Sequence, residues 1–439
     1  MELSNPLSIF EKVGIRSVRL ALFLLGGLLI YLTFYFPDFI GYVGYVLFIF
    51  APIWLPIVFF PVFKYMWMSY IRLHKMVHTE HILLEIKLSN DIIQTPKAME
   101  LVLNAMYQTG EIDTVIDEYW RGNTRPWFSL EICSFESSVH FFIWTRKRYK
   151  DMLEAQIYAH YPSVEIHEVP DYTTALRFDP KIHDLWAIEY KLQKPDVYPI
   201  QTYVDWGLDK PAKEEEKVDP ISSILEFIGS MGPGEHAWIQ IVIRAHRPKF
   251  RKKEGYIPDY ARWDYLAKEE IKSILSTTAT ENNSSGRFAD LTKGQQILVE
   301  AIERSITKKP FDTGIRVMYI WEKDKAEGNK KAGFPTAFRS FEYAAEGIWL
   351  NGLKPVFMES RPYPWQDRKG KLALEEKESL YRNYRARGFF YSPFKSVNTF
   401  VFNSEELATL YHFPGLVNRT PTLERIPSKR SGAPINLPR

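Results

Sequence analysis

The sequence predicts an α+β protein with an N-terminal two-helix transmembrane hairpin, a ferredoxin-like domain and a second α/β sandwich domain. Three observations predict this fold class. Residues 20–63 are apolar apart from one charged residue, Asp38. Residues 82–169 carry strand and helix patterns in the order β-α-β-β-α-β, which is typical of a split βαβ unit. A further, less regular series of strands and helices extends to residue 403.

The composition bounds the number of domains and the compartment. A chain of 439 residues is too long for one ordinary core, so several domains are expected. The formal net charge of +3 gives no global basic field that would demand a nucleic-acid partner. The single cysteine, Cys133, excludes an intrachain disulfide and fits a reducing compartment, and we expect it to be a buried, inert thiol.

The membrane hairpin is predicted over residues 1–63. The turn-forming residues Phe36-Pro37-Asp38 divide the apolar stretch into spans at about 20–36 and 39–63, each long enough for a hydrocarbon core of about 30 Å. A backbone in lipid must satisfy its own hydrogen bonds, so both spans are expected to be helices. The linker allows only a tight hairpin, which places both termini on one side. Three prolines in the second span, Pro52, Pro56 and Pro61, are expected to kink it.

Positive charges set the orientation of the hairpin. Basic residues flank both spans and are absent from the turn between them, so both termini and the following domains are expected on the cytoplasmic side of the inner membrane. A cleaved signal peptide is excluded because the apolar stretch is too long and a second span follows at once. The expected membrane-interface residues are Lys12, Arg16, Arg19, Lys64, Trp67, Arg72 and Lys75.

A juxtamembrane helix is predicted over residues 64–81. His74, His78 and His81 would share one face of this helix if it continued that far. No cysteine or acidic partner completes a metal-ligand set there, so we predict no metal site.

The ferredoxin-like domain is predicted over residues 82–180. The residue pattern predicts a helix that starts at Thr95 as N-cap with Pro96 in its first turn, and a β-hairpin that closes near residues 135–138. The expected elements are a strand at 82–88, a helix at 95–107, strands at 127–134 and 139–145, a helix at 148–161 and a strand at 164–169.

The second α/β domain is predicted over residues 181–403, with an insertion at 249–290. Its expected elements are a strand at 187–192, a helix at 219–228, a strand at 237–245, a helix near 260–275, a helix at 293–307, a strand at 315–322 and a helix around 338–350. The last segment, 404–439, is expected to be a short helix with an Asn-Ser-Glu-Glu cap signal, followed by a Pro-rich tail.

The sequence offers little that indicates catalysis. It contains no P-loop, dinucleotide-binding, zinc-protease or nucleophile-elbow signature. Glu131 and Glu136 flank the predicted hairpin turn and are interpreted as an exposed strand face, so no catalytic residue is assigned. Basic clusters at 146–150, 247–253 and 382–387 fit either anionic lipid or DNA, and the balance of acidic and basic residues favours lipid.

Several stretches resemble one family. They are 95–105 (TPKAMELVLNA), 125–131 (RPWFSLE), 154–159 (EAQIYA), 405–414 (EELATLYHFP) and 433–438 (APINLP). These residues resemble the membrane-proximal region of type IV secretion-like (conjugative DNA-transfer) ATPases of ultra-small bacteria. In that family the last two stretches lead into a RecA-like motor, whereas this sequence ends at Arg439.

The resemblance implies a non-enzymatic, membrane-anchored adaptor, without a cofactor of its own, that docks a separate P-loop motor ATPase. It also implies a homo-oligomer, because export motors are often rings. The alternative is a membrane scaffold or lipid-facing adaptor unrelated to export. The expected partner-docking residues are Glu405, Glu406, His412, Pro414, Pro421 and Pro434.

Overall fold

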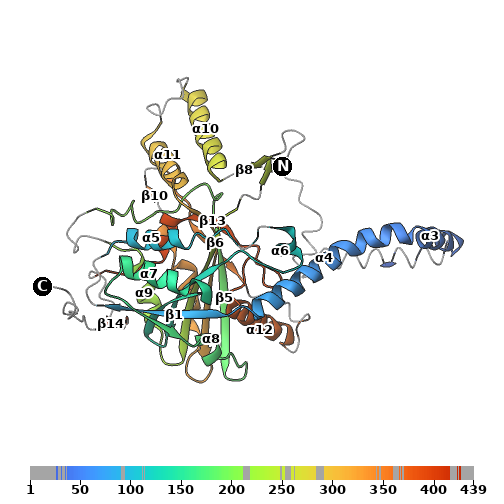
Figure 1. The fold of residues 1–439 in the computed structure, drawn as a ribbon, viewed down its shortest axis with the longest axis horizontal. Coiled ribbons are helices and arrows are strands. Elements are labelled where there is room, and N and C mark those ends of the chain that lie inside the picture. Colours follow the sequence, from blue (N-terminus) through green and yellow to red (C-terminus); the bar gives the residue numbers. More distant parts are fainter. Residues whose placement is uncertain are drawn as a thin grey trace. The chain divides into compact units, whose positions relative to one another are not determined.

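A computed structural model gives the fold (Figure 1). It describes residues 26–27, 31, 35, 37–89, 94–110, 112, 114–210, 218–247, 250–252, 259–261, 263–282, 291–342, 344–345, 348–358, 365, 367, 370–415, 423 and 425–426. The chain forms two compact units, one of residues 1–71 and 360–375, the other of residues 72–359 and 376–439.

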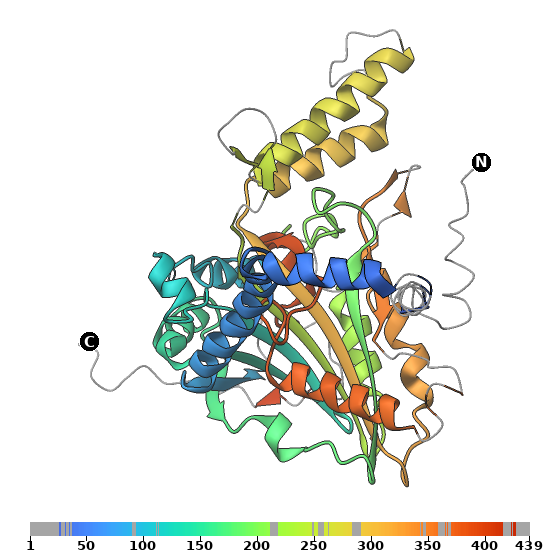
Figure 2. The same cartoon turned by 90° about the vertical axis from the view of Figure 1, so that its right-hand side faces the viewer.

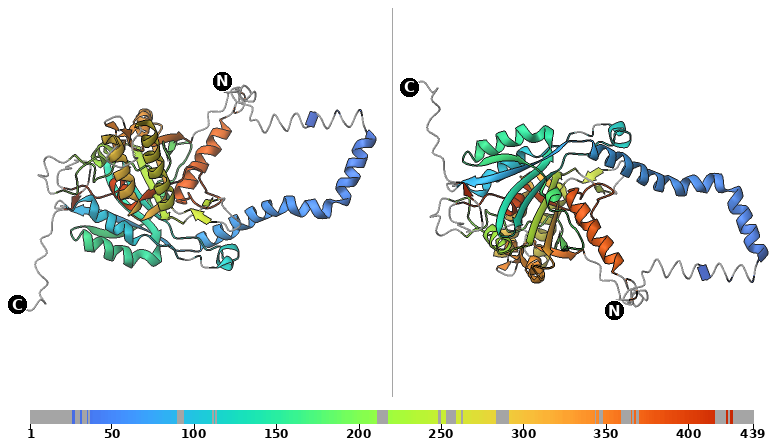
Figure 3. Two further views of the ribbon diagram at one scale, coloured as in Figure 1. Left: turned by 90° about the horizontal axis from the view of Figure 1, so that it is seen from above. Right: turned by 90° about the horizontal axis from the view of Figure 1, so that it is seen from below.

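The first unit contains the apolar helix α3 (Pro37–Ile49) and most of the apolar helix α4 (Ala51–Val77), whose last residues, from Arg72, belong to the second unit. They meet at a sharp bend at Phe50, just before Pro52 (Figure 3). Proline restricts the residue before it and cannot donate a helical hydrogen bond, which explains a break here, whereas Pro56 and Pro61 lie inside α4. Helix α4 is the one helix in the described part of the chain that is long and apolar enough to cross a membrane.

This arrangement corrects the boundaries predicted for the second span. The prediction placed residues 39–63 in one helix and began a new helix at residue 64. In the structure the helix is interrupted at Phe50, and the next helix, α4, is continuous through residue 64 to Val77. The predicted first span, 20–36, lies mostly outside the described residues.

The second unit is built on one ten-stranded sheet. All its strand pairs are antiparallel except β14 on β1. Its strands are β1 (His81–Ser89), β2 (Phe128–Phe135), β3 (Ser138–Arg146), β4 (Glu165–Val169), β5 (His183–Leu192), β6 (Glu235–Ala245), β9 (Pro310–Glu322), β12 (Leu353–Phe357), β13 (Phe400–Asn403) and β14 (Arg425–Ile426). Two small ribbons pair β7 (Phe250–Lys252) with β8 (Asp259–Ala261), and β10 (Ala344–Ala345) with β11 (Ile348–Trp349).

The helices of this part connect the strands. They are α5 (Pro96–Ala105), α6 (Val115–Tyr119), α7 (Lys150–His160), α8 (Tyr172–Ala175), α9 (Ile221–Gly229), α10 (Trp263–Asn282), α11 (Lys293–Ile306), α12 (Lys371–Arg385) and α13 (Ser404–Leu410), with single turns η1 (Lys147–Tyr149), η4 (Asn329–Ala332), η5 (Phe334–Thr336) and η6 (Arg339–Phe341).

The sheet has two halves with the same strand order. The first half runs β4-β1-β3-β2 and the second runs β12-β5-β9-β6, so in each half the order along the chain is fourth, first, third, second. The halves join where β2 pairs with β6 from Phe128 to Phe135. The strands of both predicted α/β domains therefore share one continuous sheet.

Both faces of the sheet are covered, and this explains why strands such as β6 are buried along their whole length. One face packs against apolar side chains of α5, α7, α9 and α13. The other face packs against aromatic residues that include Tyr381 and Tyr384 of α12 and the following Phe389 and Phe390.

The two halves differ in how their central strands are joined. In the first half, a two-residue turn at Glu136 and Ser137 connects β2 to β3, and Glu136 adopts a positive φ of 59°. In the second half, residues 246–309 connect β6 to β9. They carry α10 and α11, which project together from the sheet (Figures 1 and 2).

The mixed α+β class is confirmed, and most expected elements occur near their expected places. One expected helix does not form. The described residues between 338 and 350 form η6 and the two strands of the β10–β11 ribbon, and β12 then follows as an edge strand. The apolar, β-branched and aromatic residues at 348–349 suit a strand better than a helix.

Candidate docking site around helix α13

Helix α13 begins with a complete capping box, as its cap signal predicts. The Asn403 side chain accepts hydrogen bonds from the backbone N–H groups of Glu405 and Glu406, each at 2.9 Å, and Glu406 accepts one from the Asn403 N–H. The first turn thus carries two acidic side chains, Glu405 and Glu406. All seven residues of α13 are buried, so this helix is a core element.

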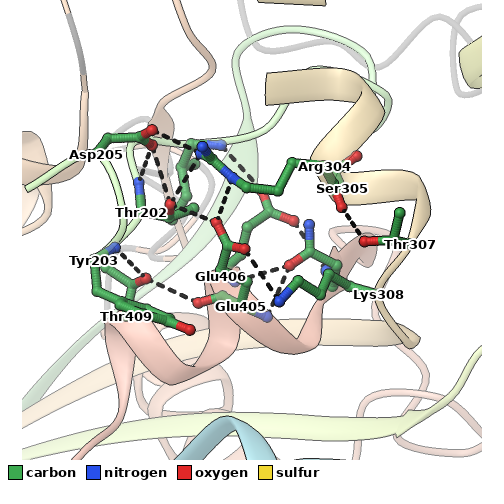
Figure 4. A network of polar contacts seen from close by, with 12 residues as sticks. Thr202, Tyr203, Asp205, Arg304, Ser305, Thr307, Lys308, Glu405, Glu406 and Thr409 are labelled. Carbon is green, nitrogen blue, oxygen red and sulfur yellow. Dashed lines mark hydrogen bonds and ion pairs between the residues drawn. The ribbon is translucent and has the colours of Figure 1, made fainter. Parts of the chain in front are cut away.

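Around α13 lies a network of polar residues that we call the α13 junction (Figure 4). It brings together α5, the segment that follows β5, the end of α11 and the start of α13. Its members are Glu100, Thr202, Tyr203, Asp205, Arg304, Lys308, Glu405, Glu406 and Thr409.

Glu405 connects α13 to the C-terminal end of α11 through hydrogen bonds and ion pairs. Its carboxylate accepts from Arg304 Nε at 2.9 Å and from the Thr202 hydroxyl at 2.6 Å, and Lys308 Nζ lies 3.4 Å away. Arg304 also donates to Asp205 at 2.6 Å. Glu405 is 2% exposed, and a polar group buried to this degree is costly without such hydrogen-bond partners.

Glu100 of α5, a helix that connects strands of the first half of the sheet, also contacts residues of the junction. It accepts from the Tyr203 hydroxyl at 2.6 Å and from Lys308 Nζ at 2.8 Å. Burial and the neighbouring Glu100 carboxylate raise the pKa of Tyr203 well above its usual value, so this hydroxyl stays protonated and donates. Lys308 therefore bridges Glu100 and Glu405, which come from different halves of the chain.

Glu406 is another buried member of the junction, with 1% of its surface exposed. Besides the cap bond, it accepts from the Ile200 N–H at 3.0 Å. Burial raises the pKa of Glu406 to about 8, although the two N–H groups favour its ionised form. Near neutral pH this carboxyl is therefore largely protonated.

The chain after α13 stays buried as well. His412 Nε2 lies 3.0 Å from the Asp219 carboxylate, and His412 Nδ1 lies 2.9 Å from the Ala408 carbonyl. Burial lowers the pKa of His412, but Asp219 and the carbonyl groups outweigh this, so the pKa is raised overall. Phe413 packs its ring against Tyr161, with centroids 4.8 Å apart.

The expected docking residues are thus divided. Glu405, Glu406, His412 and Pro414 are buried and contact the chain itself, which leaves them without an accessible surface in this structure. Pro421 and Pro434 lie outside the described residues. Between them, Leu423 forms a parallel bridge with Val139, and β14 pairs with the end of β1.

The expected membrane-interface residues fall into two groups. Lys12, Arg16 and Arg19 lie outside the described residues, and Lys64, Trp67, Arg72 and Lys75 lie on α4. The three histidines separate, because His81 belongs to β1 and stacks on Trp144 with centroids 4.4 Å apart. Burial lowers the pKa of His81 to about 4. No group of three metal-ligating side chains occurs among the residues that the structure describes.

Two of the basic clusters each bury one arginine, while their other basic side chains are exposed or half-buried. Arg146 donates to Thr124 at 2.6 Å, and Lys147 and Lys150 form ion pairs with Glu80 and Glu168. In the third cluster, Arg387 is fully buried. These contacts reduce the basic surface that either lipid or DNA could meet.

The structure also overturns the interpretation of Glu131 as part of an exposed strand face. Its side chain is fully buried because the second face of the sheet is covered, and it accepts from Arg387 Nε at 3.0 Å. Arg387 also pairs with Asp171. The sequence signal was a lone charge inside the apolar stretch 127–134, which indicates a buried charge that needs a partner. Cys133 beside it is buried as expected, and burial raises the pKa of its thiol.

A scan against protein-family models finds no match for the chain, and a search of curated proteins finds none.

Proposed function

We propose that this chain is a non-enzymatic, membrane-anchored adaptor of a type IV secretion-like export apparatus, and that it docks a separate P-loop motor ATPase. The observation that carries this proposal is the α13 junction. It joins both halves of the sheet directly before the C-terminal segment. This position suits the transmission of force from a motor bound to the C-terminal segment to the membrane-anchored sheet. The family resemblance supplies the identity of the partner.

The proposed anchor is a two-span hairpin in the inner membrane with both termini in the cytoplasm. Helix α4 supports one crossing, since its apolar side chains are largely exposed and it is long enough to span a bilayer. The positive flanking residues support the orientation.

We propose further that each half of the sheet is a ferredoxin-like unit. The strand order fourth, first, third, second and the helices α5 and α7 support this for the first half. In the second half, α9 takes the place of α5, and the turns η4 to η6 stand where α7 would be. Two such units joined edge to edge would give a rigid platform for a ring of subunits.

The burial of α13 moves the proposed docking surface to the tail beyond it. Glu405, Glu406 and His412 hold the junction together, so a partner would instead contact residues after Ile426, which follow the last strand. This refines the docking hypothesis without requiring the core to open.

The test is purification of the tagged full chain from its native membrane in detergent, with mass spectrometry of what accompanies it. We expect a P-loop motor in near-stoichiometric amount. The informative variant replaces residues 427–439 with a Gly/Ser sequence of equal length, which keeps β14 and removes the Pro-rich signal. Loss of the motor from this variant alone supports tail docking, whereas undiminished co-purification contradicts it. If lipids and unrelated envelope proteins alone accompany the full chain, the scaffold alternative replaces the export proposal.

A further inference from the structure

Helix α6 carries an exposed apolar patch. Val115 is 73% exposed, Ile116 is 58% exposed and the adjoining Trp120 is 70% exposed. The helix is well defined, because Thr114 and Asp117 form a capping box at its start. We call Val115, Ile116 and Trp120 the α6 patch. Apolar side chains gathered in this way on a surface mark a contact with another phase or partner.

The α6 patch is held beside the end of α4. Glu118 of α6 forms an ion pair with Arg72 of α4 at 3.2 Å. Helix α4 begins at Ala51, and about 20 residues are needed to cross a hydrocarbon core of about 30 Å, which brings the crossing to Tyr70. If α4 crosses the bilayer over these residues, Arg72 follows the crossing directly at the level of the lipid headgroups, and its ion pair holds Glu118 of α6 next to it.

We propose that α6 is a second membrane contact, which inserts the α6 patch into the headgroup and acyl boundary of the bilayer that α4 crosses. Tryptophan and aliphatic side chains favour this layer because their apolar bodies are buried while polar groups stay wet. Arg121, next to the patch, pairs with Asp117 at 3.0 Å, and its side chain is still 69% exposed, so the guanidinium can also face lipid phosphates. The inference rests on the proposed membrane anchoring, and lipid is the partner that covers the α6 patch.

The chain permits a site-selective probe. Its one cysteine, Cys133, is buried, and burial raises the pKa of its thiol, so an introduced surface cysteine reacts in its place. We would place an environment-sensitive dye at Ile116→Cys and, independently, at Val115→Cys in the full chain. Each variant is reconstituted into vesicles of phosphatidylcholine and phosphatidylglycerol that contain a lipid with a headgroup nitroxide quencher.

Two further positions make the outcomes distinguishable. Phe59→Cys lies in α4, where the native side chain is 56% exposed, and reports the anchor itself. Ile182→Cys is a matched aqueous control, because Ile182 is 51% exposed and precedes β5 at the sheet end opposite to the start of β1.

The expected result is roughly twofold or stronger quenching at Ile116→Cys and Val115→Cys, with no change at Ile182→Cys. If Phe59→Cys reports lipid while both α6 dyes behave like Ile182→Cys, the inference is overturned and the anchor stands. If Phe59→Cys reports water, anchoring by α4 fails and the inference fails with it. Shielding of the α6 dyes that requires a co-purified protein assigns the patch to a protein partner and also overturns the inference.

Discussion

Buried ionisable side chains set the behaviour of the α13 junction at the scale of single residues. Glu406 has a raised pKa because burial disfavours its charge, and His412 has a raised pKa because Asp219 stabilises its charge. Opposite physical causes therefore give both residues more bound protons in the folded state than in the unfolded state near neutral pH.

This predicts that the contributions of Glu406 and His412 to the free energy of unfolding fall as pH rises. The folded pKa of Glu406 is about 8 against 4.5 for the free side chain, so its contribution declines between these values. The contribution of His412 is complete below about 6.5 and is lost as pH rises through its folded pKa. In Glu406→Gln, the decrease in the free energy of unfolding between about pH 5 and pH 9 should be smaller than in wild type by about 1–3 kcal/mol. Urea unfolding of the detergent-solubilised chain measures it.

The matched control is Glu375→Gln, because Glu375 has an exposed side chain on α12. It should keep the wild-type slope. An equal slope in wild type and Glu406→Gln would show that Glu406 is ionised throughout this range.

The sequence predicts the helix cap in the α13 junction but not the partners of the capping residues. Glu405 and Glu406 are predicted as a helix cap, and the cap forms. Their burial and their partners Arg304 and Lys308 are not predictable, because about 100 residues separate α11 from α13 and no local pattern records which charges meet. The burial of Glu131 is hidden for the same reason, since α12 and the segment after it cover the strand from far along the chain.

At the scale of elements, α13 depends on its first turn. Replacing Asn403 with Ala removes the acceptor for two buried backbone N–H groups. We expect the free energy of unfolding to fall by about 1–2 kcal/mol. Hydrogen exchange should show lost protection in α13 first. Thr114→Ala, which removes the exposed cap of α6, is the control and should leave α13 protected. Unchanged exchange in α13 would contradict the role of the cap.

Most element predictions succeed because local signals decide them. The strand patterns at 82–88 and 139–145 and the Thr95-Pro96 helix start all appear, although the Thr95 hydroxyl makes no capping bond. The failures have physical reasons. The break at Phe50 depends on the backbone effect of Pro52 within a uniformly apolar stretch. Helix α12 was not among the predicted elements, although 371–385 is rich in helix-forming residues.

At the scale of the whole molecule, one segment holds both halves of the sheet together. Residues 387–398 cross the second face: Arg387 pairs with Glu131 in the first half, and the Gly388 carbonyl accepts from Arg316 in the second half. Ser396 and Asn398 both donate to Glu189, the ion-pair partner of Arg316. The paired charges occupy one register row across the sheet, since Glu131, Gln240, Arg316 and Glu189 are successive neighbours.

We therefore predict that Arg387→Ala destabilises both halves together. Removing this cation leaves the Glu131 carboxylate buried without its charge partner, which should cost about 3–5 kcal/mol. Hydrogen exchange should show lower protection in β2 and in β5. Arg385→Ala, at an exposed position in α12, is the control and should change stability by less than about 0.5 kcal/mol. A loss confined to β2 would mean that the halves unfold independently.

Strand β1 connects α4 to the C-terminal segment and would carry a force applied to that segment. Its first residue, His81, follows the end of α4 by a few residues, and its last residues, Leu88 and Ser89, hold Arg425 and Ile426 of the tail in parallel pairing. A pull on the tail would load a strand that is already extended and is flanked by β3 and β4. Such a strand stretches little, so a displacement of the tail would be transmitted along this one β-strand to helix α4 with little change in length.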